Sequence, residues 1–213
     1  MTIRVLFYVQ HLMGIGHQMR SAAVTRELVK EGFEVTYVSG GMPVPGLDLG
    51  GASFEQLPPC KSADSRFQTL VDETGNSIDA AWRETRKEVL LKLFTHVRPN
   101  ILITETFPFG RRLMRFELDP LLIRAAQITP KPLIAASIRD ILEPKSTPER
   151  YDEIADKIER WYDAILVHGD PNLVSLEATV PITEKFKSKI FYTGYVGERG
   201  ISPKSEVGQG EVM

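Results

Sequence analysis

Residues 3–32 decide the fold: IRVLFYVQ at 3–10, HLMGIGHQMR at 11–20 and SAAVTRELVKEG at 21–32. The first segment is an apolar run, the second a turn that contains Gly14 and Gly16, and the third a helical pattern that ends at Gly32. A buried strand, a glycine turn and a helix in this order open the ligand crevice of α/β sheets. We therefore expect a ligand-binding turn at Gly14, Gly16 and His17.

Strand patterns recur along the chain with helical segments between them. This alternation predicts an α/β fold, a single domain with a parallel sheet of about seven strands and helices on both faces. The runs at 5–9, 101–103 and 164–167 are apolar at consecutive positions, as expected for central strands that are covered on both sides. The predicted strands are 3–9, 33–38, 53–57, 100–103, 132–136, 164–168 and 189–193.

Four helices are predicted, at 17–31, 79–97, 111–127 and 148–162. Gly32 suits the left-handed conformation that ends the first helix, and Pro148 suits the first position of the last. Pro120 should kink the third helix or split it in two. The inward stripe of the first helix is expected at Met19, Ala22, Ala23 and Leu28.

The remaining segments are glycine-rich or polar. We expect mobile loops at 40–51 and 58–75, and we interpret Cys60 as a loop thiol. After Tyr195 the sequence has no periodicity and little to bury. The predicted domain is therefore 1–197, and 198–213 is expected to be an unstructured tail or a truncated interdomain linker.

The composition limits the partners and the compartment. Lys and Arg total 26 against 28 Asp and Glu, a net charge of -2, so no global field recruits nucleic acid. The single cysteine excludes an internal disulfide and suits a cytoplasmic protein. No uninterrupted apolar stretch approaches the roughly 20 residues of a membrane span, although a peripheral membrane contact is compatible with this sequence.

Two residues are candidates for catalysis. His17 follows the glycine turn at a predicted helix N-terminus, where the helix dipole favours the neutral imidazole that a general base needs. Glu105 follows the strand at 100–103, so its carboxylate should reach the same crevice and orient the imidazole. The alternatives are structural: His17 as a helix cap and Glu105 as a cap of the following turn.

Arginines and glycines are the candidates for substrate binding. Arg20, Arg111, Arg112 and Arg139 fall just after predicted strands or in the first turns of helices, so the fold could gather them at the carboxyl edge of the sheet. Arg20 and Arg139 follow strands closely and are expected to hold a phosphate or carboxylate, whereas Arg112 and Arg115 are expected on solvated faces. Gly14 and Gly16 leave backbone amides free for a ligand. The dinucleotide pattern fails because Met19 stands at its third glycine, and neither a phosphate-loop motif nor metal-ligand spacing is present.

The turn GIGHQMR at 14–20, the strand FEVTYVSGG at 33–41 and the segment ILVHGDP at 165–171 resemble a predicted bacterial glycosyltransferase family. The family is similar to the MurG-like, family-28-like GT-B superfamily, which uses nucleotide sugars. The resemblance covers residues 1 to about 197 and implies the Rossmann-like N-terminal domain, which binds the acceptor. It also implies that Gly14 and Gly16 shape the cleft loop and that His17 faces acceptor or donor phosphates.

The resemblance implies no metal or cofactor, with a nucleotide sugar as co-substrate and a small or lipid-linked molecule as acceptor. In that superfamily a C-terminal domain binds the donor, and its glycine-rich loop has no counterpart in this sequence. We therefore expect this chain to transfer hexosyl groups poorly or not at all by itself. The alternatives are a non-catalytic acceptor-binding subunit, which an exposed apolar face near Phe107, Phe109 and Tyr195 would favour, and an epimerase-like fragment.

Overall fold

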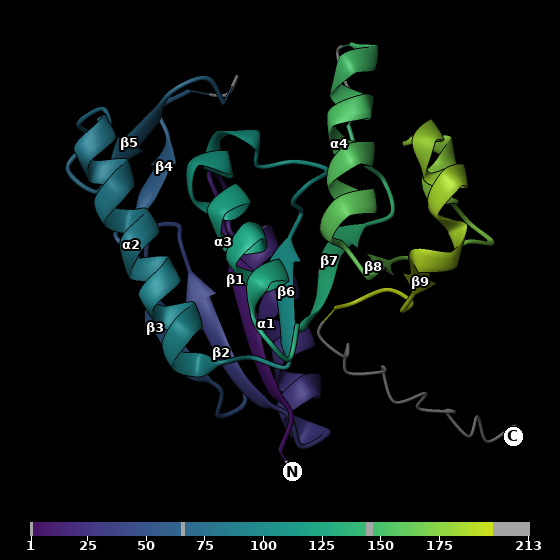
Figure 1. The fold of residues 1–213 in the computed structure, drawn as a ribbon, viewed down its shortest axis with the longest axis horizontal. Helices are drawn as coiled ribbons and strands as arrows, with labels where there is room; N and C mark the ends of the chain where they lie inside the picture. The colour runs from purple at the N-terminus through teal and green to yellow at the C-terminus, as the bar shows by residue number, and fades with distance from the viewer. Residues whose placement is uncertain (1, 65–66, 144–146, 198–213) are drawn as a thin grey trace, which may run out of the picture.

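The centre of the fold is a seven-stranded parallel sheet with the strand order β3-β2-β1-β6-β7-β8-β9 (Figure 1). The computed structural model describes residues 2–64, 67–143 and 147–197. The predicted α/β class and all seven predicted strands are confirmed. The strands are β1 Arg4–Val9, β2 Glu34–Ser39, β3 Ser53–Gln56, β6 Ile101–Glu105, β7 Leu133–Arg139, β8 Ala164–His168 and β9 Ile190–Tyr192.

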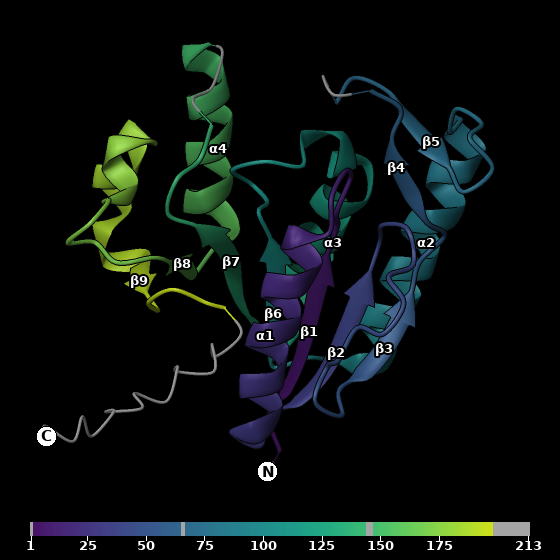
Figure 2. The same cartoon turned by 180° about the vertical axis from the view of Figure 1, so that it is seen from behind.

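Helices cover both faces of this sheet. Three of them, α2 (Ala80–Val97), α3 (Arg115–Gln127) and α4 (Pro148–Trp161), lie on the face seen in Figure 1. The opposite face carries α1 (Gly16–Lys30), as Figure 2 shows. Short 3-10 helices are η1 Arg112–Met114, η2 Leu176–Ala178 and η3 Pro181–Lys189.

Strand β1 is buried on both faces because its side chains alternate between two cores. Val5, Phe7 and Val9 pack with Ala22 of α1, whereas Leu6 and Tyr8 belong to the core under α2, α3 and α4. All five of these β1 side chains are fully buried. A strand in this position must be apolar at consecutive residues, which explains the continuous run in the sequence.

The predicted helix boundaries hold to within a few residues. Gly32 has a φ of +87° directly after α1, and the Asp79 carboxylate accepts a hydrogen bond from the Trp82 backbone N–H at 2.7 Å. Both devices satisfy backbone groups at helix ends. The predicted split at Pro120 is wrong, because α3 continues through this residue, and the predicted kink stays a prediction.

The predicted inward stripe of α1 is wrong at one of its four residues. Ala22 and Ala23 are buried and Leu28 packs against the same core, but Met19 is 39% exposed. Polar residues occupy the other buried positions, and Gln18 is held by a hydrogen bond from its amide to the Ser39 hydroxyl at 3.0 Å. Hydropathy alone cannot reveal this polar contact between α1 and β2.

The expected mobile loop at 58–75 is a β-hairpin in the described residues. Strands β4 (Cys60–Ser62) and β5 (Leu70–Asp72) pair antiparallel beside α2 (Figure 1). Cys60 and Leu70 are buried and give the hairpin an apolar core, which the mainly polar composition of the segment did not indicate. Cys60 is therefore not a loop thiol: it lies in a strand, and burial raises the pKa of its thiol to about 11.

A buried ion pair joins the hairpin to α2 and α3. The Arg86 Nε donates to Glu117 at 2.7 Å, and both side chains are completely buried. The other guanidinium nitrogens donate to the carbonyls of Gly40 and Pro58 and to the Gln10 side chain, at 2.8, 2.6 and 2.6 Å. Burial opposes the charge on Arg86, but Glu117 outweighs this effect and raises the pKa of the guanidinium.

Two glycines after β2 make this network possible. A Cβ at Gly40 would collide with the side chains of Gln10 and Arg86, and a Cβ at Gly41 would collide with His11. The loop expected at 40–51 is present, but its first residues are fixed by these close approaches.

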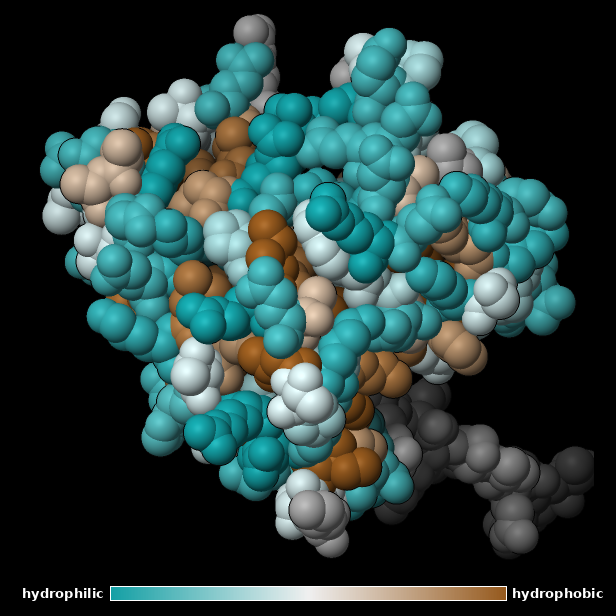
Figure 3. All heavy atoms as spheres, in the orientation of Figure 1, coloured by the Kyte–Doolittle hydropathy of each residue, from teal (hydrophilic) through white to brown (hydrophobic). Residues whose placement is uncertain are grey.

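The predicted tail at 198–213 lies outside the described residues, so its structure stays a prediction. Within the part of the chain that is described, no helix is long and apolar enough to cross a membrane. The surface over α2, α3 and α4 is largely hydrophilic, with apolar residues visible between the helices (Figure 3).

Candidate functional site

The carboxyl ends of β1 and β6 meet where the strand order reverses. The chain continues from β1 to β2 and β3 on one side, and from β6 to β7, β8 and β9 on the other. The loops that follow two such strands diverge and leave a crevice, which is where open α/β sheets bind ligands. His17 follows β1 and Glu105 ends β6. The two candidate catalytic residues therefore meet at this switch point.

The glycine turn leaves the start of α1 open. Gly14 has a φ of +55°, a conformation that favours glycine, and α1 begins at Gly16. Beyond chain neighbours, no described protein atom lies within 4 Å of a Cβ built at either glycine. No side chain caps α1 within the described residues, so its first backbone N–H groups are available to a ligand.

His17 is bound to Glu105 through one ring nitrogen. Its Nδ1 lies 2.6 Å from Glu105 Oε1. Because a carboxylate only accepts hydrogen bonds, the Nδ1–H donates, and the lone pair of the neutral imidazole is then on Nε2. Nε2 has no hydrogen-bond partner among the described residues, and the side chain is 29% exposed. The arrangement is that of an oriented general base with its basic nitrogen free.

Glu105 is completely buried and surrounded by donors. Oε1 also accepts hydrogen bonds from Arg20 Nη2 at 2.7 Å and from the Thr106 hydroxyl at 2.5 Å, and Arg111 Nε lies 3.9 Å from Oε2. Burial by itself would raise the pKa of Glu105. The hydrogen bond and charge of His17, together with Arg111 and Thr106, outweigh burial and hold this pKa below its ordinary value.

This cluster is not closed. Arg20 Nε, Glu105 Oε2 and Arg111 Nε are buried and have no hydrogen-bond partner within the described residues. Buried polar atoms are nearly always paired, and each exception needs an explanation, of which a ligand or ordered water is one. The unpaired atoms all lie around the carboxylate that holds His17.

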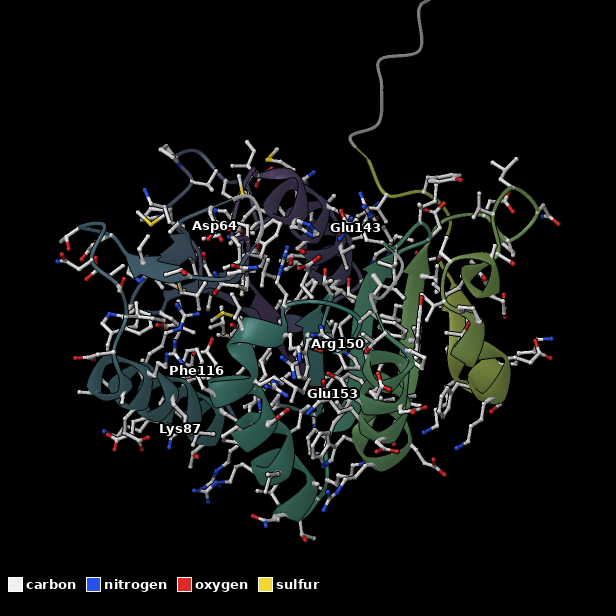
Figure 4. All side chains as sticks on the ribbon, turned by 90° about the horizontal axis from the view of Figure 1, so that it is seen from above. Asp64, Lys87, Phe116, Glu143, Arg150 and Glu153 are labelled. Carbon is white, nitrogen blue, oxygen red and sulfur yellow. The ribbon has the colours of Figure 1, made fainter. Side chains whose placement is uncertain are left out.

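A cavity of about 560 Å³ lies beside the imidazole. Figure 4 looks down onto this edge of the sheet, with Asp64 on the hairpin side and Glu143 and Arg150 on the α4 side. The lining combines apolar and cationic side chains: Leu12, His17, Phe67, Gln68, Thr106, Phe109, Gly110, Arg111, Arg112, Leu113, Arg139, Leu142, Glu143 and Arg150.

Three larger cavities are lined by described residues. Two, of about 730 and 760 Å³, lie at the amino end of the sheet and include Arg98 and Arg124, where such folds do not bind ligands. The third, of about 630 Å³, lies between α1, the loop at 46–48 and residues 193–197. None of the three is lined by a residue of the His17 cluster. The smaller cavity at the carboxyl edge is therefore the candidate site.

The two arginines predicted to bind substrate differ in position. Arg20 is held by Glu105, so its guanidinium is part of the histidine cluster. Arg139 is the last residue of β7, is exposed and lines the cavity without touching His17 or Glu105. Among the described residues its guanidinium makes no hydrogen bond or ion pair. A role in anion binding remains a prediction for both.

Sequence reasoning did not single out two contributors to this site. Thr106 donates to Glu105, and Arg150 reaches the cavity from α4. Arg111, which the sequence grouped with Arg20, Arg112 and Arg139, lies beside the same carboxylate and lines the cavity. Position directly after the β6 strand could have indicated Thr106. No sequence signal could have indicated Arg150, because α4 meets the site only through tertiary packing.

His168, at the same edge, has both ring nitrogens engaged. Its Nε2 is bonded to the Ser137 hydroxyl at 2.8 Å and its Nδ1 to the Thr193 hydroxyl at 2.7 Å. Burial lowers the pKa of His168 to about 4. His11 is buried with its Nδ1 2.9 Å from the Gln18 amide, and burial lowers its pKa as well. Neither of these histidines lines the cavity, in contrast to His17.

Phe107 and Phe109 do not form the exposed apolar face that would favour a non-catalytic subunit. Both side chains are 1% exposed. The Phe107 carbonyl accepts hydrogen bonds from the hydroxyls of Thr104 and Tyr162, which draw the loop inward. Tyr195 is exposed, but Phe107 and Phe109 are buried and add no apolar surface to it.

A metal centre is not apparent in the described part of the chain. No three His, Cys, Asp or Glu side chains there are grouped in a way that could hold an ion. The candidate site consists of an imidazole, a carboxylate and arginines.

Comparison with known proteins identifies the fold. No protein-family model and no curated protein sequence matches the chain. CalG4, the calicheamicin glycosyltransferase, matches with a TM-score of 0.50 and 13% identity, over 92% of this chain and 53% of that one. UGT2 of Phytolacca americana, complexed with UDP-2-fluoro-glucose and pterostilbene, matches with a TM-score of 0.52 and 13% identity. The match covers 93% of this chain and 55% of that one. A UDP-N-acetylglucosamine 2-epimerase matches with a TM-score of 0.51 and 14% identity, over 92% of this chain and 49% of that one.

These similarities establish architecture, since the identities are low. The chain has the fold of the N-terminal half of GT-B enzymes and spans about half the length of these neighbours.

Proposed function

We propose that this chain is the acceptor-binding half of an inverting, MurG-like glycosyltransferase that transfers a hexosyl group from a nucleotide sugar to an acceptor hydroxyl. The observation that carries the proposal is the His17–Glu105 pair. Its 2.6 Å hydrogen bond lies at the sheet's switch point, and the free Nε2 of His17 stands beside a cavity. The GT-B fold of the chain supports the same proposal.

His17 Nε2 would accept the proton of the acceptor hydroxyl as its oxygen attacks the anomeric carbon of the donor. A carbon–oxygen bond forms on one face of the sugar while the bond to the nucleoside diphosphate breaks on the other. The resulting imidazolium is stabilised by Glu105, whose buried carboxylate stays ionised because its pKa is held low.

The remaining predicted residues would position the substrates. The open N-terminus of α1, between Gly14 and His17, would bind a phosphate of the donor or acceptor. Arg139 would hold an anionic group in the cavity, and Arg20 would fix the Glu105 carboxylate. The acceptor is a small or lipid-linked molecule, which the enzyme meets in the cytoplasm of a bacterium or at a peripheral membrane contact.

The donor would be bound by a second, donor-binding unit that faces this edge of the sheet. That unit is either a further part of the same polypeptide or a separate chain. Without it, the proximity and electrostatic contributions that lower the barrier are missing, so residues 1–213 alone should transfer little sugar.

An activity assay tests the proposal. This chain would be joined to the donor-binding half of CalG4 and supplied with labelled nucleotide sugars and a panel of hydroxyl acceptors. His17→Ala should lower the transfer rate by about 10²–10⁴-fold, the usual contribution of a general base. His96→Ala, at an exposed residue of α2 far from the site, is the matched control. Equal turnover by wild type and His17→Ala would contradict the proposal.

An epimerase is the second candidate, because the 2-epimerase matches the fold as well as the transferases do. An epimerase converts its nucleotide sugar without an acceptor. Formation of the epimer of UDP-N-acetylglucosamine in acceptor-free reactions would favour this candidate over transfer.

A further inference from the structure

The cavity beside His17 has a cationic wall built from three parts of the chain. Arg111 and Arg112 precede or begin η1, Arg139 ends β7, and Arg150 lies in the first turn of α4. These elements bring their arginines to one cavity at the carboxyl edge of the sheet, where Figure 4 labels Arg150. Charges gathered in this way repel one another and cost free energy unless an anion offsets them.

The carboxylates nearby neutralise only part of this wall. Glu153 is shared by Arg112 and Arg115, at 3.1 and 2.8 Å. Glu105 is already bonded to His17 and Arg20, and Arg111 stands 3.9 Å from its second oxygen.

Arg139 and Arg150 make no side-chain hydrogen bond or ion pair within the described residues. Burial and the neighbouring Arg112 lower the pKa of the Arg150 guanidinium. Glu143, an exposed carboxylate in the lining that has interactions of its own, is the acidic residue of the cavity. Two guanidinium groups are thus left free to bind an anion.

Besides His17, Gln68 and Thr106, the rest of the lining is mainly apolar. Leu12, Phe109 and Leu142 are buried side chains of the cavity, and Phe67 and Leu113 contribute further hydrocarbon. Such a surface suits the apolar body of a ligand, whereas paired guanidinium groups suit a carboxylate or phosphate.

We propose that the acceptor is an amphipathic anion, an apolar molecule that bears both a hydroxyl and a carboxylate or phosphate. Arg139 and Arg150 clamp the oxyanion, the apolar body lies along Phe109 and Leu142, and the hydroxyl meets Nε2 of His17. This inference rests on the proposed function for the role of the hydroxyl. The anion site itself is inferred from the two arginines in the cavity lining and does not depend on the proposed function.

Ligand titrations monitored by NMR test the proposal on the full chain. The probes are 4-hydroxybenzoate, phenyl phosphate and the neutral isostere 4-hydroxybenzamide. We expect at least one anion to bind, and the amide to bind more weakly than 4-hydroxybenzoate if the carboxylate is the favoured group. Binding of 4-hydroxybenzoate alone identifies a carboxylate acceptor, and binding of phenyl phosphate alone identifies a phosphorylated one.

The double variant Arg139→Gln/Arg150→Gln should weaken anion binding roughly tenfold or more, because charge-assisted hydrogen bonds are lost. Arg124→Gln/Arg160→Gln removes the same charge from exposed positions outside the cavity and is the matched control. The proposal is overturned if neither anion binds, if the amide binds as tightly as both anions, or if the two double variants behave alike.

The same titration separates this inference from the proposed function. His17→Ala should keep the anion bound, because the clamp does not include the imidazole. Anion binding without any sugar transfer by the fused enzyme would remove the transferase proposal and leave the anion site standing. Sugar transfer without anion binding would remove the anion site and leave the transferase proposal standing.

Discussion

Two buried polar clusters lie on either side of β1, and they differ in how completely they are paired. In the Arg86–Glu117 cluster every guanidinium nitrogen has a partner within the described residues, and Tyr8 donates to the same carboxylate. In the His17–Glu105 cluster Arg20 Nε, Glu105 Oε2 and Arg111 Nε have no hydrogen-bond partner within the described residues, although the last two form a 3.9 Å ion pair. Both contain a carboxylate with no exposure.

This difference in hydrogen bonding distinguishes a cluster that stabilises the fold from one that can bind a ligand. A closed network stabilises the fold and has no capacity for a ligand, whereas unpaired atoms at a cavity are kept at a cost that a ligand can offset. The first cluster fixes the hairpin to α2 and α3. The second is where a substrate would complete the hydrogen bonding. Three substitutions test this contrast, and a fourth tests His168, a fully paired buried histidine outside both clusters.

Arg86→Ala should have the largest effect. It leaves Glu117 charged and buried, and breaking a buried pair in this way costs about 3–5 kcal/mol in the free energy of unfolding. Urea denaturation followed by circular dichroism measures the loss. Lys185→Ala, which breaks the exposed pair with Glu159, should change stability far less. Equal effects of the two variants would contradict the structural role of the closed cluster.

His168 should make folding sensitive to acid. Its pKa is about 4 in the folded state against an ordinary value of 6.5, so the unfolded chain binds the proton first. The contribution is fully present above pH 6.5 and is lost as the pH falls through 4. It amounts to about 3 kcal/mol. His168→Gln should flatten the dependence of urea stability on pH between 7 and 4, except for a smaller part due to His11. An unchanged slope would show that burial of His168 is not responsible.

Glu105→Gln should lower the free energy of unfolding moderately, and only at pH values at which the wild-type carboxylate is ionised. The variant leaves Arg20 and Arg111 without their anion, a loss of about 1–3 kcal/mol at pH 7. Because the folded pKa of Glu105 is lowered from 4.5, the wild-type advantage is present above pH 4.5 and disappears as the pH falls through the folded value. Denaturation of both proteins at pH 7 and below 4 measures this. A constant difference at all pH values would exclude ionisation as its cause.

Gly16→Ala should have the smallest effect on stability. Its Cβ meets no described protein atom within 4 Å, so unfolding should change by about 1 kcal/mol or less, in the stabilising direction if at all. Ligand binding at the α1 N-terminus should weaken, and titration with inorganic phosphate measures this loss. Gly40→Ala, whose Cβ collides with Arg86 and Gln10, should unfold the closed cluster instead. If Gly16→Ala binds phosphate like wild type, the open turn is not a phosphate site.

Parts of the fold and site were predictable from particular residues. Consecutive apolar residues located β1, β6 and β8, and Gly32 and Pro148 marked helix ends correctly because these signals act within one element. His17 and Glu105 could be placed together because both follow neighbouring parallel strands. The hairpin at Cys60 could not be predicted, since its few apolar residues are buried by α2 and not by a pattern of their own.

The sequence by itself determined the α/β architecture and the position of His17 at the start of α1, because strand and helix periodicity and the glycine turn are local properties. Tertiary structure alone decided which charged groups are closed and which are open. Arg20, predicted for substrate, pairs with Glu105, while Arg150 joins Arg139 at the cavity. The pairing of a charge depends on what distant segments bring within a few ångströms of it, and the strand order fixes this.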